Sequence, residues 1–295
     1  MENKIIISGF ADEISVRFSR QLKVVKQLGM QYLCLRTING KSIAAYTPKE
    51  AEKKLLRPLN EAGIRVSSLG SPIGKVPIDD EEAFQKQLVQ LENLCGVCKV
   101  LQCRYIRIFS FFMPKDENPE DYKDAVLQKL RQFVAIAQRH DIVLLHENEK
   151  DIFGDTAARC RFLFDALESP YLQGAFDAAN FVQCKENPLE AFALLKDKIA
   201  YIHIKDAVYT DNENVLCGTG DGQIPEVLRQ AMANGYSGFL TLEPHLVLFN
   251  ALKNLETGDV KKLFVKQKAK NGADGYRMQY EALCDILRAQ DIAFL

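Results

Sequence analysis

The residues with the clearest capacity for chemistry are acidic and imidazole side chains at the ends of apolar runs. Four of them each close a different short apolar segment in the second half of the chain: Glu147, Asp177, His203 and Glu243. Carboxylates that converge without a cation repel one another, and a divalent ion between them removes that conflict. Three carboxylates and one imidazole suit Mn²⁺ best, with Mg²⁺, Co²⁺ or Zn²⁺ possible. The pattern therefore predicts one divalent metal ion held by these four residues.

The elements that must position these residues follow a regular alternation of short β-branched runs and longer helical patterns. The expected strands are Ile5–Gly9, Tyr32–Arg36, Ile64–Leu69, Tyr105–Phe109, Ile142–Glu147, Gly174–Asp177, Ala200–Ile204 and Gly238–Glu243. The expected helices are Ser15–Leu28, Pro48–Ala62, Asp79–Cys98, Pro119–Gln138, Thr156–Leu167, Pro188–Leu195, Ile224–Asn234 and Tyr276–Arg288. Such βα repeats build parallel sheets, and eight of them fit a closed (β/α)8 TIM barrel of class α/β. We expect residues 1–295 to form this single domain, with a doubly wound open sheet as the weaker alternative.

In a TIM barrel, polar side chains at the carboxyl ends of the strands line the mouth where active sites are built. The four candidate ligands end the fifth to eighth expected strands, so this fold would bring them together. Two stretches depart from the repeat, Phe112–Asn118 and roughly Pro244–Asp274. Both follow carboxyl ends of strands, and we expect them to contribute to the rim or to a lid.

The composition of the chain indicates which classes of molecule it is expected to bind. Lysine and arginine number 38 against 39 aspartate and glutamate residues, and no basic block runs through the chain. A nucleic-acid backbone would therefore find little electrostatic attraction. The first apolar run ends at Ser8, too early for a signal peptide, and no later run approaches a membrane span. We expect a cytoplasmic protein that acts on a small molecule and binds neither nucleic acid nor membrane, with a homo-oligomer left open.

The eight cysteines are scattered and predict reduced thiols rather than a disulfide framework. Cys95 and Cys98 form a CxxC inside a helical pattern, without the second pair that a zinc site needs. Buried helix positions explain them better than a metal or redox role.

Several further polar residues are candidates for substrate contact. Lys205 lies two residues beyond His203 and so shares its strand face near the mouth. His245 lies two residues past Glu243 on the loop side, where it could contact substrate or support a ligand. His146 alternates with the neighbouring glutamate and should face the helices as a neutral, hydrogen-bonded histidine.

Five other polar residues lie near or after the ends of the earlier strands. Arg36 and Arg107 close or nearly close the second and fourth strands, and Ser68 lies on the third, followed by Ser71 and Lys75. Such side chains could bind substrate hydroxyls or a phosphate. The glycines of GTGDG, residues 218–222, predict a tight loop before a helix that could bind an anion, although it lacks the GK[ST] ending of a P-loop.

Five segments of the sequence resemble the xylose isomerase-like barrels, which include sugar phosphate isomerases and epimerases, tagatose-type ketose 3-epimerases and inosose dehydratase. They are LLHENE (Leu144–Glu149), GAFDAAN (Gly174–Asn180), YIHIKDA (Tyr201–Ala207), GTGDGQI (Gly218–Ile224) and GFLTLEPH (Gly238–His245). The resemblance spans most of the chain and is weakest in the N-terminal third. It implies a TIM barrel whose metal ligands are the same Glu, Asp, His, Glu series.

The resemblance also implies an activity, that of a metal-dependent isomerase or epimerase of a small sugar or sugar phosphate. In the family's epimerases the two glutamates, here Glu147 and Glu243, also exchange the substrate proton. The chemistry agrees, because a C–H beside a carbonyl is a very weak acid until a metal polarises the carbonyl and stabilises the enediolate. A carboxylate placed at that carbon can then remove the proton.

Other functions are compatible with the same residues. The endonuclease IV branch uses further histidines, including one three residues after the strand-six aspartate, where this chain has Asn180. Asn180, which we assign to substrate contact, also departs from the tagatose-epimerase pattern, where histidine is usual. An inosose dehydratase-like lyase stays open, because enolisation is also the first step of β-elimination. The remaining alternative is a non-catalytic sugar-binding barrel that keeps the pocket.

Overall fold

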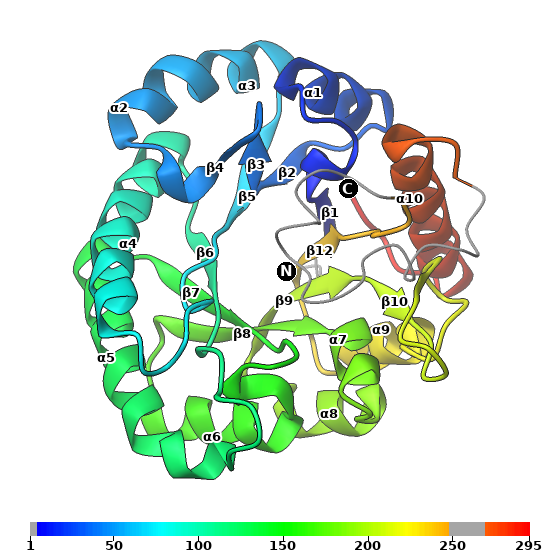
Figure 1. The fold of residues 1–295 in the computed structure, drawn as a ribbon. Helices are drawn as coiled ribbons and strands as arrows, with labels where there is room; N and C mark the ends of the chain where they lie inside the picture. The colour runs from blue at the N-terminus through cyan, green and yellow to red at the C-terminus, as the bar shows by residue number, and fades with distance from the viewer. Residues whose placement is uncertain (1–4, 248–268) are drawn as a thin grey trace.

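The computed structural model describes residues 5–247 and 269–295. At its centre lies a ring of eight strands surrounded by helices (Figure 1). The strands are β1 (Ile5–Gly9), β2 (Tyr32–Leu35), β5 (Arg65–Gly70), β6 (Tyr105–Ile108), β7 (Val143–Glu147), β8 (Leu172–Asp177), β9 (Ile199–Ile204) and β12 (Gly238–Leu242). Each contains most of one predicted strand, so the expected positions of all eight are confirmed.

The strands form one sheet in the order β1-β12-β9-β8-β7-β6-β5-β2, and all neighbours in it are parallel. The ring closes where β1 meets β2, through a single bridge between Phe10 and Cys34. The protein is therefore a nearly closed (β/α)8 TIM barrel, as the sequence predicts. Because parallel neighbours end at the same edge, the carboxyl ends of β7, β8, β9 and β12 lie side by side.

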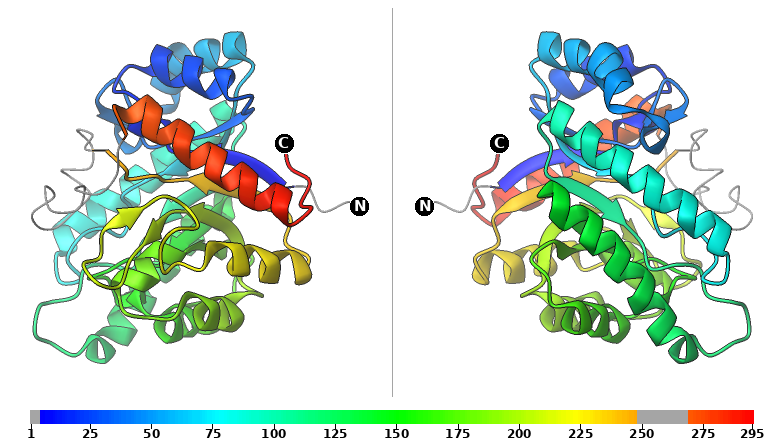
Figure 2. Two further views of the ribbon diagram at one scale, coloured as in Figure 1. Left: turned by 90° about the vertical axis from the view of Figure 1, so that its right-hand side faces the viewer. Right: turned by 90° about the vertical axis from the view of Figure 1, so that its left-hand side faces the viewer.

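The helices form an outer layer around the barrel, with α10 on one side and α4 and α5 on the opposite side (Figure 2). They are α1 (Phe18–Gln27), α2 (Pro48–Ala51), α3 (Arg57–Ala62), α4 (Glu81–Leu101), α5 (Lys123–His140), α6 (Ala157–Leu167), α7 (Ala178–Gln183), α8 (Pro188–Leu195), α9 (Ile224–Ala233) and α10 (Gly272–Ala289). A π-helical stretch, Glu52–Leu56, joins α2 to α3. Side-chain N-caps begin several of the helices, including a capping box between Thr47 and Glu50 at the start of α2. Helix α7 was not predicted from the sequence, and Asp177 caps it directly at the end of β8.

Backbone hydrogen bonds join the loops that follow β5, β6 and β7 on one side of the barrel mouth. The N–H groups of Phe109 and Phe111 donate to the carbonyls of Ile73 and Gly74, both at 2.8 Å, and Phe153 donates to Phe111 at 3.1 Å. Gly74 is required there, because a Cβ at its φ of +87° would lie 2.0 Å from the Phe109 carbonyl oxygen. These contacts place Phe112, the start of one stretch predicted as rim, at the mouth above β5 to β7.

Two short hairpins add to the same rim, β3 (Thr37–Ile38) with β4 (Lys41–Ser42) and β10 (Asp206–Ala207) with β11 (Asn214–Val215). The second stretch predicted as rim or lid, roughly Pro244–Asp274, lies largely outside the described residues, which omit 248–268. The prediction for that segment therefore stays untested.

The inside of the barrel contains a layer of polar side chains beneath the mouth. The Tyr201 hydroxyl lies 2.9 Å from the hydroxyls of Ser67 and Ser68 and 2.6 Å from that of Thr241. Ser8 adds a bond of 2.6 Å to Ser67. Since all these hydroxyls are buried, their mutual bonding lets a polar layer exist inside the core without unsatisfied groups.

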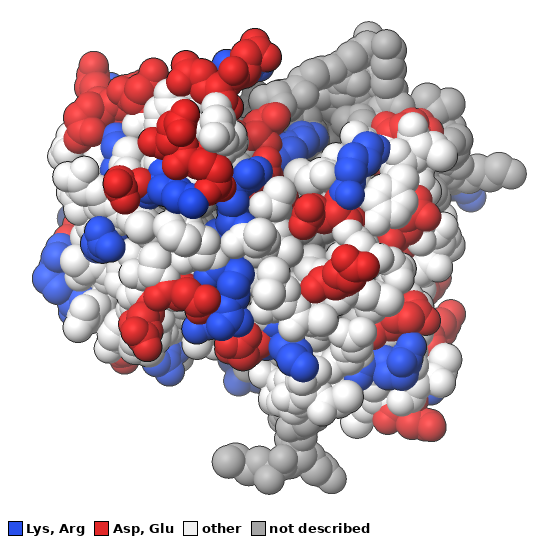
Figure 3. All heavy atoms as spheres, turned by 90° about the horizontal axis from the view of Figure 1, so that it is seen from below, with Lys and Arg blue, Asp and Glu red and all other residues white. Residues whose placement is uncertain are grey.

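Acidic and basic side chains are interspersed on the face seen from below in Figure 3, as the nearly balanced charge of the chain leads one to expect. Among the helices of residues 5–247 and 269–295, none is both long and apolar enough to cross a membrane.

Tyr201→Phe tests the polar layer. The substitution removes the hydroxyl shared by Ser67, Ser68 and Thr241, so it should lower the free energy of unfolding by about 1–3 kcal/mol. Urea unfolding would measure this, with Tyr32→Phe on β2 as a half-buried control that should change stability little. A Tyr201→Phe protein as stable as the wild type would contradict the role given to the layer.

Candidate metal centre

The four predicted ligands meet at the mouth of the barrel. One ligand atom from each of Glu147, Asp177, His203 and Glu243 lies within 4.8 Å of all the others. His203 is central, since its Nδ1 lies 2.8 Å from Glu147 Oε1, 3.4 Å from Glu243 Oε2 and 3.9 Å from Asp177 Oδ2. All four residues are at most 3% exposed. The structure thus brings together every residue that the sequence predicts as a ligand.

The strand register explains this convergence. Asp177 and Thr241 are the partners of His203 on the two neighbouring strands, and Glu243 lies two residues beyond Thr241, so its side chain points to the same face. Glu147 pairs with Ala175 at the end of β7, and its side chain reaches His203 across β8. Asp177 also fixes its own side chain, because its Oδ1 accepts the Asn180 N–H at 2.9 Å and leaves Oδ2 toward the cluster.

The oxygens at this point fit a cation. Glu147 Oε2, Asp177 Oδ2 and Glu243 Oε2 are buried and accept no hydrogen bond of good geometry among the described residues, although Arg107 and Lys205 lie at ion-pair distance from the first two. Buried polar atoms in native proteins nearly always have a partner, so three such oxygens around one imidazole mark a place for a positive ion. A donor set of carboxylates and imidazole without thiolate suits a catalytic divalent ion better than a structural zinc.

The electrostatics of the cluster follow from burial and proximity. Burial alone would raise the pKa of Glu147, but the neighbouring His203 and Arg107 lower it to about 2. Burial would lower the pKa of His203, yet the same glutamate and Glu243 raise it to about 9. Burial raises the pKa of Asp177 to about 6, which nearby Lys205 partly counters. Without an ion, His203 is therefore an imidazolium that must lose its proton before it can ligate a metal.

Two permanent cations border the cluster, as predicted from the strand faces. Lys205 Nζ lies 3.3 Å from Asp177 Oδ2, and Arg107 Nη1 lies 3.1 Å from Glu147 Oε2. The Arg107 guanidinium stacks against the rings of Phe10 and Phe109, with centroids at 5.1 and 4.8 Å. Its Nε is buried and has no acceptor among the described residues, so a substrate oxygen could accept from it.

The other three predicted substrate contacts lie at different depths. Asn180 donates to the Asn148 carbonyl at 2.8 Å, while its buried Oδ1 has no donor in the described parts of the chain. His245 Nε2 lies 3.3 Å from Glu243 Oε1, beside the cluster. Ser68 lies lower, in the polar layer, where its hydroxyl contacts Cys34 Sγ at 3.0 Å and Tyr201 at 2.9 Å. The structure thus brings Asn180 and His245 to the centre and keeps Ser68 apart from it.

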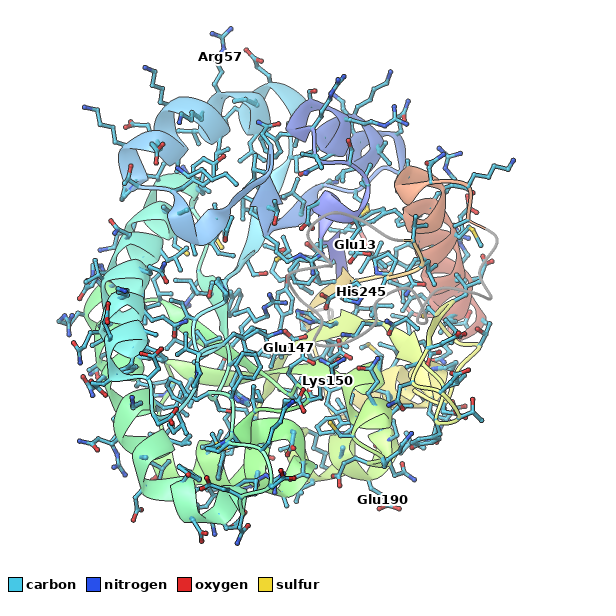
Figure 4. All side chains as sticks on the ribbon, viewed as in Figure 1. Glu13, Arg57, Glu147, Lys150, Glu190 and His245 are labelled. Carbon is cyan, nitrogen blue, oxygen red and sulfur yellow. The ribbon has the colours of Figure 1, made fainter. Side chains whose placement is uncertain are left out.

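The sequence analysis did not single out a carboxylate pair, Asp12 and Glu13, which lies in the short 3-10 helix Ala11–Glu13 just after β1. Both are buried and contact Arg36, whose guanidinium also donates to Glu243 Oε1 at 2.7 Å. The sequence made Arg36 a candidate for substrate contact, with an ion pair as the alternative, and its donors are engaged by the protein's own carboxylates. The signal that could have revealed the pair is its place, two adjacent acids at the carboxyl end of an apolar strand. Figure 4 shows Glu13, Glu147 and His245 near the centre of the barrel, with Arg57 and Glu190 in the outer layer.

The glycine loop, residues 218–222, binds the carboxylate of Asp206 from the same chain. The N–H groups of Gly218, Gly220 and Gly222 donate to the Asp206 carboxylate at 2.8, 3.0 and 2.9 Å. A Cβ on either of the last two glycines would lie about 2.5 Å from that carboxylate. The loop is therefore a structural clamp that anchors the segment following Lys205.

Two other sequence interpretations can be compared with the structure. His146 does face the helical layer, but neither ring nitrogen has a hydrogen-bond partner among the described residues, contrary to expectation. Burial lowers its pKa to about 4, so it is neutral and packs edge-on against Phe164. Cys95 and Cys98 are both buried in α4, as the helix interpretation predicts.

Comparison with known proteins agrees with the geometry. A family model described as xylose isomerase-like TIM barrel matches residues 22–257. A probable L-ribulose-5-phosphate 3-epimerase, UlaE, from Mycoplasma pneumoniae is 23% identical over 150 residues. That match covers 51% of this chain and 49% of the relative, so the chain spans about half the length of this curated protein.

Solved structures share the fold over nearly the whole chain. D-allulose 3-epimerase from Methylomonas sp. has a TM-score of 0.73 at 14% identity and covers 97% of this chain and 98% of its own. An IolI protein with a bound zinc atom has a TM-score of 0.72 at 16% identity, with the same 97% and 98% coverage. At such identities the likeness concerns the fold.

Metal analysis tests the four-residue centre. We expect about one divalent ion per chain, with a melting temperature that falls on exhaustive chelation, because an ion bound only by the folded state stabilises it. Since His203, with a pKa of about 9, must release a proton to ligate, Mn²⁺ affinity should rise with pH up to about that value. His203→Ala should lower the affinity strongly. A protein that neither binds a divalent ion nor responds to chelation would refute the site.

Proposed function

Because the chain belongs to the xylose isomerase-like TIM barrel family, we propose that it is a divalent-metal-dependent isomerase or epimerase of a sugar or sugar phosphate. The observation that carries this proposal is the placement of two carboxylates on opposite sides of His203. Glu147 approaches from β7 and Glu243 from the end of β12, and the Oε2 of each is buried and accepts no hydrogen bond among the described residues, although Arg107 lies 3.1 Å from that of Glu147. Two carboxylates at one reacting carbon provide for proton removal and proton return.

The proposed mechanism assigns each residue one task. One divalent ion, with Mn²⁺ preferred by this donor set, would polarise the substrate carbonyl and stabilise the enediolate charge. Glu147 or Glu243 removes the proton from the carbon beside that carbonyl, and the other carboxylate delivers a proton to the opposite face in an epimerisation. Lys205, Arg107 and Asn180 bind substrate oxygens, and His245 supports the site beside Glu243. Burial of all these groups keeps bulk water from the proton in transit.

Ser68 was also predicted to touch the substrate, and its position favours another role. Its hydroxyl already contacts Tyr201 and Cys34 inside the barrel, so we leave it out of the proposed substrate site. The epimerase activity named for the Mycoplasma relative supports the choice of epimerisation, and the carbohydrate substrate is part of the same proposal.

A second candidate is an inosose dehydratase-like lyase, and Lys205 is the observation that favours it. Elimination of water needs an acid for the leaving hydroxyl after the first proton has been removed. Burial would lower the pKa of Lys205, but Asp177 and Glu243 raise it overall, so an ammonium is available at neutral pH. Incubation with ketoses, ketose phosphates and inososes in D₂O separates the candidates, because epimerisation exchanges hydrogen for deuterium whereas dehydration yields an unsaturated product. Saturable binding without any turnover would indicate a non-catalytic sugar-binding barrel.

Isosteric replacement of the two glutamates tests the proton-transfer roles. Glu147→Gln and Glu243→Gln each keep an oxygen for the metal but cannot act as a base, so each should lose at least about 10²-fold in kcat. The variant without the base should show no deuterium exchange at the reacting carbon, while the other should exchange without inverting. Glu190→Gln, in the outer layer, is the control. Near-normal turnover by both variants with metal bound would rule out the mechanism.

Lys205→Ala tests recognition of the substrate. Loss of the ammonium beside Asp177 should lower kcat/KM by about tenfold or more while the metal content stays near that of the wild type. The matched control is Lys198→Ala, which removes a lysine just before β9, at the opposite end of the same strand. If Lys205→Ala has unchanged kinetics on the best substrate, Lys205 does not belong to the substrate site.

A further inference from the structure

A second group of ionisable side chains lies beside the metal centre, on the seam where β1 and β2 close the barrel. It contains Asp12, Glu13, Arg36 and His245, all at most 6% exposed, and it joins the centre through Glu243. Burying so many charges costs desolvation free energy, and a buried ion network is a weak source of stability. A role in holding Glu243 in place accounts for the presence of this buried group.

Arg36 connects the members of this group. Its Nε and Nη2 donate to the two oxygens of Asp12 at 2.9 and 3.1 Å, which is the forked geometry that fixes a guanidinium plane. Nη2 also reaches Glu13 Oε1 at 3.2 Å, and Nη1 reaches Glu243 Oε1 at 2.7 Å. The Phe10 ring lies beneath the guanidinium, with its centroid 4.4 Å away. Arg36 is therefore held on several sides, and its remaining bond orients Glu243.

The consequence for Glu243 is a division of its two oxygens. Oε1 is engaged by Arg36, and Oε2 is left facing His203 Nδ1 at 3.4 Å in the ligand cluster. The backbone after Glu243 is held by the same group, because Glu13 Oε2 accepts the His245 N–H at 2.7 Å. His245 adopts a left-handed conformation with φ of 48°, which a non-glycine residue rarely keeps without such support.

The contacts of Arg36 also bear on whether a second metal ion would bind between Glu13, Glu243 and His245. Glu13, Glu243 and His245 also offer ligand atoms within 4.8 Å of one another, as a metal site would. Arg36 already contacts both of these carboxylates, at 3.2 and 2.7 Å, so the guanidinium supplies the positive charge that a second ion would bring.

We propose that Arg36 is a positioning residue that takes the place of a second cation: anchored by Asp12, it fixes one oxygen of Glu243 and presents the other to a single metal ion. It acts through Glu243 and touches neither substrate nor metal. The kinetic part of this inference rests on the proposed function, whereas the metal-binding part does not.

Arg36→Met, which keeps an unbranched apolar stem but removes every donor, is the direct test. Calorimetry with Mn²⁺ alone should show an affinity about 10- to 100-fold weaker than that of the wild type, the range typical of groups that orient metal ligands. With saturating Mn²⁺, kcat should fall by at least about tenfold while KM changes less, since Arg36 does not contact substrate. Arg36→Lys should recover only part of either loss, because an ammonium cannot hold Asp12 and Glu243 in one plane.

The control is Arg65→Met, which removes a guanidinium from the start of β5 at the far end of the barrel and should leave both readouts unchanged. If Arg36→Met does not fold, Asp12→Asn takes its place, since it loosens the forked contact with Arg36 without changing Glu243 and should also weaken Mn²⁺ binding.

A folded Arg36→Met with wild-type Mn²⁺ affinity overturns the proposal, even when its melting temperature is lower. Lack of turnover by the wild type on any sugar would instead count against the proposed function, and the Mn²⁺ titrations would still decide the role of Arg36.

Discussion

Like charges gathered in a buried space are the constraint on which the rest of the structure depends. Five carboxylates at the mouth of the barrel face three permanently cationic side chains, so acidic groups outnumber the permanent cations there even though burial raises the pKa of one of them, Glu13, to about 7. The carboxylates belong to Asp12, Glu13, Glu147, Asp177 and Glu243, and the cations to Arg36, Arg107 and Lys205. In a low-dielectric interior such a balance matters more than any single contact. One metal ion would therefore complete the electrostatics of the centre as well as its chemistry.

The polar groups around Tyr201 and in the glycine loop form hydrogen bonds with their neighbours and do not occupy the ligand atoms of the metal centre. Beneath it, the hydroxyls of the layer around Tyr201 bond to one another, and beside it the glycine loop takes up the Asp206 carboxylate. Because these groups satisfy one another, the buried oxygens that lack donors are concentrated where the four strands end. A rigid, internally satisfied scaffold is what allows a few unsatisfied groups to be held in a productive arrangement.

How much the sequence could predict depended on the range of the interactions. The eight strands and the clustering of the four candidate ligands were predictable because each depends on a local pattern, an apolar run ending in a polar residue. The bonds of Arg36 to Asp12 and Glu243 span 24 and 207 residues and exist only once the barrel closes, so no local pattern indicates them. Ser68 shows a related limit, since strand alternation predicts which face a side chain occupies but not its depth. The glycine loop was predicted to bind an anion, and its sequence could not reveal that the anion is Asp206.

The two proposed catalytic glutamates are held in parallel ways, which bears on the choice between reactions. Glu147 has an arginine at 3.1 Å from one oxygen and Glu243 has another at 2.7 Å, and both are buried in the same cluster. A reversible epimerase needs each carboxylate to serve as base in one direction and as acid in the other, so closely matched surroundings suit it. A dehydratase instead needs one base and one separate acid, a requirement that Lys205 could meet. The matched pair of arginines favours the proposed epimerisation, and Lys205 is the residue whose role would distinguish the two reactions.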